Sequence, residues 1–185
     1  MRHFAVLSLS LALVACQSQV VTRDFDASRD FASYRSWSWK EPALQYLPDD
    51  PRIKSDLTEQ RVREAVSEQL DQRGLRPTAT GSKADVNVQA YLIVENRQQQ
   101  ISSYRGGWGG YWGGGPWGGG PMFNETRTLE YRVATLQIDL LDGRDGKLVW
   151  RGSAEQIMND ASEPGERSAA IYKSVAKVLS AYPPH

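Results

Sequence analysis

DVNVQAYLIVEN, residues 85–96, alternates apolar and polar side chains almost without a break. Val86 and Val88 fall on one side of an extended chain, and Asn87 and Gln89 fall on the other. Alternation with a period of two is typical of a strand that has one face on a core and the other largely in water. This stretch therefore predicts a sheet that is covered mainly on one face.

Two further strands are predicted downstream. The first runs from 128 to 141, and its apolar residues change phase near Val133, which predicts a β-bulge there. The turn sequence Asp-Gly-Arg-Asp-Gly at 142–146 then leads into another strand at 147–158. Because a short glycine-containing turn joins these two strands, we expect them to pair as an antiparallel hairpin.

The last of these strands is predicted to place Trp150 in the core. Leu148 and Trp150 lie on one face, and Gly152 can leave room for the large indole ring. Arg151 alternates to the other face, where we expect it to pair with Asp139 across the hairpin. An exposed pair of this kind contributes little, about 0 to 1 kcal/mol.

Two helices are predicted outside this hairpin. The first begins at Asp56, where Asp56 and Glu59 have capping-box spacing, and it ends at Gly74, beyond which Leu75 is expected to make a hydrophobic contact. The second follows Pro164. Residues at helical spacing define the side of each helix that faces the core: Val62, Ala65, Val66 and Leu70 in the first, and Ser168, Ile171, Tyr172, Val175, Val178, Leu179 and Tyr182 in the second.

Two shorter strands are predicted nearer the start of the chain. The first covers residues 20–26, and the second covers 36–39, where Trp37 and Trp39 share a face. Three prolines between 42 and 51 lack amide donors and predict a loop after the second strand.

Strands and two helices in this order predict an α+β fold. The expected architecture is a mainly antiparallel sheet with two helices packed on one face. Residues 20–185 suffice for one domain with a real core and are few for two, so we expect a single domain.

A glycine- and tryptophan-rich segment at 104–122 separates the two long strands. It holds ten glycines, together with Trp108, Tyr111, Trp112 and Trp117. Glycine-rich chain loses much entropy on ordering, so the segment is predicted to be a mobile loop outside the core. Its aromatic side chains are candidates for contact with a protein partner, a sugar ring or lipid headgroups. The alternative is a low-complexity expansion of a hairpin connection without a ligand.

The start of the chain has the pattern of a lipoprotein signal. Residues 1–15 combine Arg2 with an apolar run too short to span a bilayer, which indicates a signal peptide. The sequence LVAC at 13–16 resembles the lipobox of bacterial lipoproteins, in which Cys16 would be acylated and residues 16–19 would form an acylated tether. The alternative is an ordinary secreted protein that keeps Cys16 as a free thiol.

The residue after the cysteine bears on the membrane that receives the protein. In the sorting rule of enteric bacteria, Asp at this position retains a lipoprotein in the inner membrane, and this chain has Gln17. By that resemblance, the outer membrane is favoured, with the domain on its periplasmic face. The acyl chains on Cys16 would supply the membrane contact, since they bury many methylenes.

The charge and the residue types exclude several classes of function. Loss of Arg2 with the signal leaves 21 basic groups against 22 acidic groups, a balance that does not fit a nucleic-acid-binding surface. His3 is lost with the signal and His185 is the last residue, so neither a Ser-His-Asp nor a Cys-His arrangement is available in the usual way. We therefore expect no enzyme, no cofactor and no metal site. The alternative is a carboxylate-based envelope enzyme, in which Asp139 and Glu155 would face each other across the hairpin.

Several segments together resemble a known family. They are Asp24–Asp26 with Asp30–Phe31, Tyr34–Trp39, Lys83–Val88, Leu136–Asp142 and Gly146–Gly152. In this order they resemble the bacterial lipoprotein family catalogued as domain of unknown function 4136, over roughly residues 20–182. The resemblance implies a periplasm-facing lipoprotein, and because the family carries no established activity, it implies no catalytic residues.

The resulting hypothesis is a non-enzymatic, membrane-tethered domain that binds another envelope component, protein or glycan. Aromatic side chains and exposed strand edges would make the contact. A purely structural role in the envelope, without a specific ligand, is the other non-enzymatic interpretation. The sequence leaves the oligomeric state open.

Overall fold

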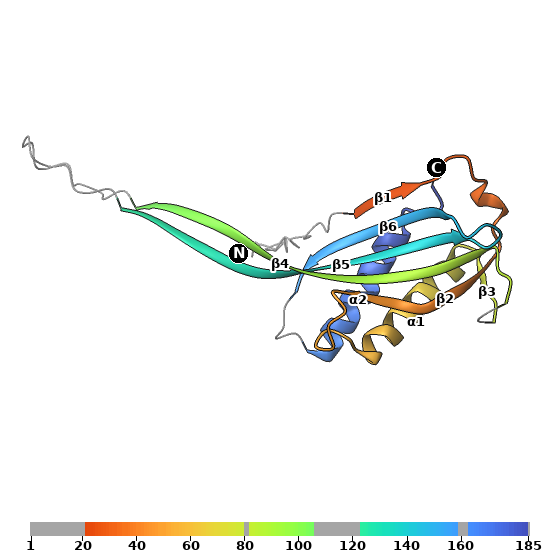
Figure 1. Ribbon diagram of the computed structural model, residues 1–185, viewed down its shortest axis with the longest axis horizontal. Coiled ribbons are helices and arrows are strands. Elements are labelled where there is room, and N and C mark those ends of the chain that lie inside the picture. Colours follow the sequence, from red (N-terminus) through yellow and green to blue (C-terminus); the bar gives the residue numbers. More distant parts are fainter. Residues whose placement is uncertain (1–20, 80–81, 106–122, 159–162, 185) are drawn as a thin grey trace, which may run out of the picture.

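The computed structural model describes residues 21–79, 82–105, 123–158 and 163–184 (Figure 1). The elements, in chain order, are β1 (Val21–Phe25), the short 3-10 helix η1 (Phe31–Ser33), β2 (Ser36–Leu47), α1 (Asp56–Gln72), β3 (Arg76–Pro77), β4 (Val86–Arg105), β5 (Phe123–Asp142), β6 (Leu148–Ile157) and α2 (Pro164–Leu179). Within these described ranges, the strands form one six-stranded sheet in the order β1-β6-β5-β4-β2-β3.

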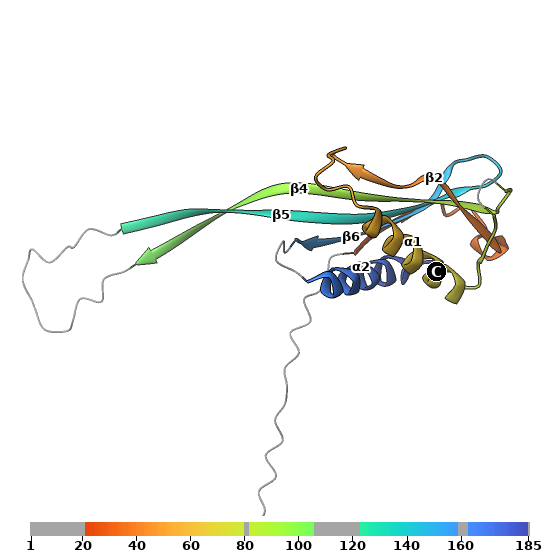
Figure 2. The same cartoon turned by 90° about the horizontal axis from the view of Figure 1, so that it is seen from below.

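The sheet is mixed but mostly antiparallel. β1 with β6, β6 with β5 and β5 with β4 are antiparallel pairs, whereas β2 is parallel to both β4 and β3. Figure 2 shows α1 and α2 side by side against the curled sheet, and the two helices contact each other. The predictions of an α+β fold and a mainly antiparallel sheet are confirmed.

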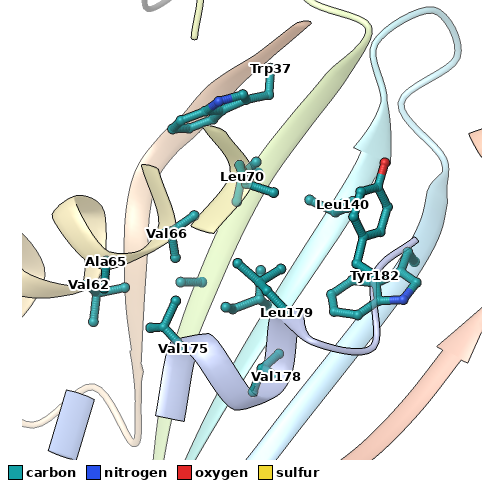
Figure 3. Packing of buried hydrophobic residues seen from close by; sticks show 14 of the residues in the cluster. Trp37, Val62, Ala65, Val66, Leu70, Leu140, Val175, Val178, Leu179 and Tyr182 are labelled. Carbon is teal, nitrogen blue, oxygen red and sulfur yellow. The ribbon is translucent and has the colours of Figure 1, made fainter. Parts of the chain in front are cut away.

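The core lies between the two helices and the sheet, and it uses the predicted residues (Figure 3). Helical spacing places the apolar residues of each helix on one stripe, and period-two alternation places those of the strands on one face. The buried set includes Val62, Ala65, Val66 and Leu70 of α1, Val175, Val178 and Leu179 of α2, and Trp37, Val86, Val88, Ile138, Leu140 and Trp150 of the sheet.

The ends of α1 follow the sequence with one correction. The helix begins at Asp56, but the cap is Ser55, whose Oγ accepts a hydrogen bond from the Thr58 amide at 3.4 Å. At the other end, Gly74 adopts a φ of +84°, a conformation that favours glycine, and the Leu75 amide donates to the Leu70 carbonyl at 3.1 Å. Leu75 is buried, as predicted.

The predicted loop at 42–51 is partly wrong, because β2 continues to Leu47. Its register against β4 shifts between Trp39 and Leu44. Pro42 lies inside this irregularity, where the ladder is already interrupted, so its missing amide removes no regular pairing. The alternation of Ser36–Trp39 alone did not indicate that the strand resumes beyond the proline.

The predicted bulge near Val133 is also wrong. β4 and β5 pair without a register shift from Val86–Asp142 to Arg105–Phe123. Val133 and Ala134 are both buried although they point to opposite faces, and this burial on both faces explains the change of phase in the apolar pattern.

The irregularity of the hairpin lies nearer its turn. The β5–β6 register shifts between Leu140 and Leu141, which pair with Trp150 and Leu148. Val149 is consequently the extra residue in β6 and is buried, whereas Leu148 is 41% exposed. The prediction that Leu148 shares the buried face of Trp150 is therefore wrong.

The prediction for Trp150 and Gly152 is confirmed. The Trp150 side chain is 0% exposed, and its ring centroid lies 5.6 Å from that of Tyr182 in an edge-to-face contact. A Cβ atom added to Gly152 would lie 2.4 Å from Cη2 of Trp150 and 2.8 Å from a methyl carbon of Val178. Only glycine at position 152 therefore leaves enough space for the Trp150 ring.

Candidate functional site

The β4–β5 hairpin extends well beyond the rest of the sheet (Figures 1 and 2). The neighbouring strands end at the pairs Leu47–Ile93 and Val133–Ile157, and the hairpin continues for ten more pairs, from Asn96–Arg132 to Arg105–Phe123. We call residues 96–105 and 123–132 the arm. At a rise of about 3.4 Å per residue, the arm is about 30 Å long.

The arm leads to the segment that the sequence singled out. Tyr104 and Arg105 belong to β4, so the strand extends into the predicted loop. The candidate contact residues Trp108, Tyr111, Trp112 and Trp117 lie outside the described residues, and so does the predicted lipid-attachment residue, Cys16. The described part of the site is therefore the arm that carries 106–122 between its two strands.

The two faces of the arm differ in chemistry. One face, which we call the Leu129 face, carries Arg97, Gln99, Ile101, Ser103, Arg127, Leu129 and Tyr131. The other, the Thr128 face, carries Gln98, Gln100, Ser102, Thr126, Thr128 and Glu130. On the Leu129 face, two aliphatic side chains meet solvent, since Ile101 is 44% exposed and Leu129 is 49% exposed.

The Thr128 face is polar throughout and makes cross-strand contacts of its own. Nε2 of Gln98 donates to Oε1 of Glu130 at 2.9 Å, and the hydroxyl oxygens of Ser102 and Thr126 lie 3.4 Å apart. Among the side chains that the structure describes, the arm thus has one polar face and one face that mixes aliphatic, aromatic, arginine and small polar side chains.

A charged contact fixes the base of the arm to β6. Arg97 donates from Nη1 and Nη2 to the two carboxylate oxygens of Glu155, at 2.6 and 2.8 Å, and from Nη2 to Glu95 at 3.0 Å. The hydrogen bonds that Arg97 donates to Glu155 and, next in size, to Glu95 raise the pKa of its guanidinium. These contacts join the arm to the sheet where the β5–β6 pairing ends.

Asp139 and Glu155 do not form the carboxylate pair that an enzyme would need. The residue opposite Asp139 is Arg151, and the residue opposite Glu155 is Thr135. Arg151 donates from Nε and Nη2 to both oxygens of Asp139, at 2.7 and 2.6 Å, and Asp139 is only 3% exposed. The predicted Arg151–Asp139 pair is confirmed, and each carboxylate is held by its own arginine.

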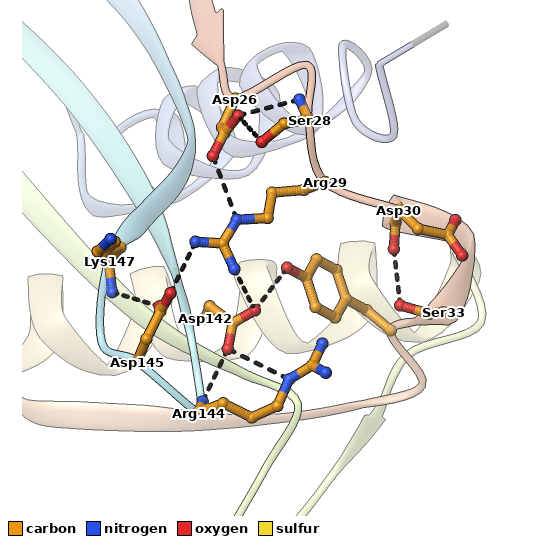
Figure 4. Close-up of polar contacts among 10 residues, drawn as sticks. Asp26, Ser28, Arg29, Asp30, Ser33, Asp142, Arg144, Asp145 and Lys147 are labelled. Atoms are coloured by element: carbon orange, nitrogen blue, oxygen red, sulfur yellow. Dashed lines mark hydrogen bonds and ion pairs between the residues drawn. The ribbon is translucent and has the colours of Figure 1, made fainter.

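A second polar cluster lies at the opposite end of the hairpin, around the 142–146 turn (Figure 4). Arg29 contacts three carboxylates there: Nε lies 3.2 Å from Asp26, Nη1 lies 3.2 Å from Asp142, and Nη2 lies 2.7 Å from Asp145. Asp142 also accepts a hydrogen bond from the Tyr34 hydroxyl at 2.9 Å. This cluster connects the turn to the segment between β1 and β2.

The environment of Asp142 sets its charge. Burial alone would raise the pKa of its carboxyl, but hydrogen bonds from the Arg144 amide and the Tyr34 hydroxyl outweigh burial, so its pKa lies below 3.8. Burial and the hydrogen bond to Asp142 raise the pKa of Tyr34 to about 12. The predicted turn is confirmed, and its carboxylates are engaged by arginine, tyrosine and backbone amides.

An apolar pocket of about 240 Å³ lies between the helices and the sheet, near the base of the arm. Its wall includes Leu92, Leu136 and Ala154 of the sheet and Ile171 of α2, with Glu166 as the one carboxylate in its lining. General acid–base chemistry on a sugar needs two carboxyl groups at a defined separation. This pocket, as described, supplies one.

The described residues contain no group of three or more His, Cys, Asp or Glu side chains placed to hold a metal ion. Neither do they contain a helix with the length and apolar character needed to cross a membrane.

Shortening the arm is expected to leave the fold intact. Deleting residues 99–129 and joining Gln98 to Glu130 by an Asn-Gly turn removes no described residue of the core cluster, and the described side chains in the deleted range, 99–103 and 126–129, are exposed. We expect the free energy of unfolding, measured by urea denaturation, to change by less than about 1 kcal/mol. Deleting only 105–121 is the matched control for the glycine-rich segment. A loss of cooperative unfolding in either variant would contradict this prediction.

Comparisons with known proteins agree with this architecture. A family model described as "Domain of unknown function (DUF4136)" matches residues 21–184. The structure is similar to that of a DUF4136 family protein from Bacteroides thetaiotaomicron, with 18% identity, a TM-score of 0.53, and coverage of 89% of this chain and 96% of the other. A search of curated proteins gave no match to the sequence.

Two more solved structures are among those matched. A PDZ domain protein from Parabacteroides distasonis has 14% identity and a TM-score of 0.55 over 89% of this chain, which spans only 35% of that protein. A lipoprotein from Neisseria meningitidis has 11% identity and a TM-score of 0.37, with coverage of 78% of this chain and 97% of the other. At 14% identity, the similarity to the Parabacteroides distasonis protein concerns the fold alone.

Proposed function

We propose that this chain, which belongs to the DUF4136 family, is a membrane-anchored, non-enzymatic lipoprotein of the bacterial envelope that binds a protein or glycan partner through the arm. The observation that carries the proposal is the arm itself. Ten strand pairs extend beyond the sheet and carry a segment with three tryptophans between their ends. Exposed aromatic side chains are enriched where proteins contact other molecules.

The strand edges of the arm support a binding function. From Val94 onward, β4 has no neighbouring strand on its outer edge in the ranges that the structure describes. An extended peptide can add to such an edge through main-chain hydrogen bonds. A lipid anchor would raise the local concentration of the domain near an envelope partner and so favour a weak contact of this kind.

The finer features of the proposal rest on the sequence. Residues 20–185 form one domain with both helices on the same face of the sheet. Cys16 carries the acyl chains, and Gln17 directs the protein to the outer membrane, where the domain faces the periplasm. The bidentate pairing of Asp139 and Glu155 with arginines favours binding over carboxylate-based catalysis.

The lipid anchor is tested by mass spectrometry of the protein purified from bacterial membranes. We expect an acylated N-terminal Cys16 and recovery of the protein in the outer-membrane fraction. Cys16→Ala should leave an uncleaved or soluble form, while Ser18→Ala, the matched control in the tether, should change neither the mass of the lipid nor the fraction. A mature protein that begins at another residue without acyl chains would refute the anchor.

Partner binding is tested by crosslinking and capture from intact cells. The full chain should retain a crosslinked partner that the 99–129 deletion loses. If the 105–121 deletion also loses the partner, the contact lies in the glycine-rich segment, and Trp108, Trp112 and Trp117 changed together to Ser should reproduce the loss. Equal capture by all variants would refute the arm as the binding surface.

A further inference from the structure

The anchor and the arm leave the sheet at the same end. Val21, the first residue of β1, lies opposite Ala154 in β6, which lies opposite Leu136 in β5, which in turn lies opposite Leu92 in β4. β1 runs from this level toward Phe25, away from the arm. The first residue of β1 therefore lies at the end of that strand nearer the arm, and β1 points away from the arm (Figure 1).

The two segments have very different reach. Cys16 is five residues before Val21, so a fully extended tether spans at most about 17 Å. From the level of Leu92 to its end at Arg105, β4 extends about 44 Å. The tip of the arm therefore lies more than 25 Å farther from the level of Val21 than the tether can reach.

This difference excludes two orientations of an anchored molecule. If the arm pointed straight at the membrane, its outer part would enter the bilayer, where polar side chains on both faces of a two-stranded ribbon are strongly unfavourable. If the arm pointed straight away, the sheet from Leu136 to Asp142, about 20 Å long, would have to fit between Val21 and the membrane, which exceeds the reach of the tether. An arm that lies along the membrane surface keeps its polar residues out of the bilayer and leaves Val21 within reach of the tether.

The chemistry of the arm selects the face that meets the lipid. The Leu129 face offers two exposed aliphatic side chains, Ile101 and Leu129, with Tyr131 and Arg127 beside them. Tyrosine and arginine place their polar ends among headgroups while their apolar parts lie deeper. The Thr128 face offers amide, hydroxyl and carboxylate groups, which water solvates as well as headgroups do.

We propose that the Leu129 face of the arm lies against the phospholipid headgroup surface of the membrane that holds Cys16. The inference rests on the proposed lipid anchor. It makes the arm a second contact with the bilayer and places any partner of the glycine-rich segment in the layer next to the membrane.

The test uses the full acylated chain in vesicles of phosphatidylethanolamine and phosphatidylglycerol. The chain has a single cysteine, and acylation consumes its thiol, so an introduced cysteine is the only labelling site. Leu129→Cys and Thr128→Cys place an environment-sensitive fluorophore on neighbouring residues of opposite faces. We expect a quencher attached to the lipid to reduce emission several-fold more at position 129 than at position 128.

Each other outcome has a distinct meaning. Equal quenching at the two positions, or stronger quenching at 128, overturns the inference while leaving the anchor intact. A blue shift at 129 that appears without vesicles and grows with protein concentration overturns it in favour of a second copy of the chain. Shielding at 129 only in native membranes overturns it in favour of a protein partner. If mass spectrometry finds no acyl chain and the protein stays off the vesicles, the proposed function fails and takes this inference with it.

Discussion

Replacing Trp150 by alanine is expected to lower the free energy of unfolding by about 3–5 kcal/mol, as for other fully buried large aromatic residues. The side chain is fully buried and packs edge-to-face against Tyr182, so its removal leaves a cavity that the surrounding elements can close only in part. Urea denaturation followed by far-ultraviolet circular dichroism measures the loss. Trp108→Ala, in a segment that we expect to lie outside the core, should change the stability very little. Equal losses in the two variants would show that the core is misplaced.

Gly152 provides a second test of the same contact. Gly152→Ala places a methyl group against Cη2 and Cζ2 of Trp150, atoms that phenylalanine lacks. The substitution should therefore be less destabilising in a Trp150→Phe background than in the natural chain, although the contact with Val178 remains. Additive effects of the two substitutions would mean that the ring and the glycine do not constrain each other.

Replacing Asp142 by alanine is expected to destabilise the fold by about 3 kcal/mol. The carboxylate is 0% exposed and receives the Tyr34 hydroxyl, the Arg144 amide and Arg29, so its removal leaves buried donors without an acceptor. Asp145→Ala is the matched control in the same turn, because this aspartate also contacts Arg29 but is considerably more exposed. Asp145→Ala should lower the free energy of unfolding by a clearly smaller amount. A larger loss of stability for Asp145→Ala would mean that Asp142 does not make the main contact that holds the turn.

The effect of Asp142 should depend on pH. Its pKa in the folded protein lies below 3.8, so the folded state binds the proton less readily than the unfolded state. The carboxylate therefore stabilises the fold above pH 3.8, and this contribution is lost as the pH falls through the lower folded value. The difference in stability between the natural chain and Asp142→Asn should shrink at acid pH. A difference that stays constant would contradict the assignment.

The core could be predicted from the sequence because local periodicity reports burial directly. The alternation around Val86 and Val88 and the helical spacing around Val62 and Val66 need no knowledge of distant residues. The pair Asp139–Arg151 was accessible because a short turn brings its two strands side by side.

The arm could not be predicted, because its strands carry no hydrophobic period. Gln98, Gln100 and Ser102 are polar, and their neighbours on the other face are mixed, so nothing in the side-chain pattern distinguishes a paired ribbon from a loop. Backbone pairing between β4 and β5, rather than the side-chain pattern, makes this part of the chain a ribbon. The Arg29–Asp142 contact was missed because it joins residues 113 positions apart. The place of β2 between β4 and β3 is equally non-local.

The position of β1 gives the proposed lipid anchor a mechanical consequence. β1 is an edge strand that pairs only with β6, over five residues, and its first residue faces the anchored end. A pull on the anchor along the strand would load these ladder hydrogen bonds in shear, because they lie perpendicular to the strand. The next connection inward is the contact of Asp26 with Arg29, which also holds the 142–146 turn. Tension from the membrane would therefore be carried through β1 and Arg29 to the 142–146 turn, at the far end of the hairpin.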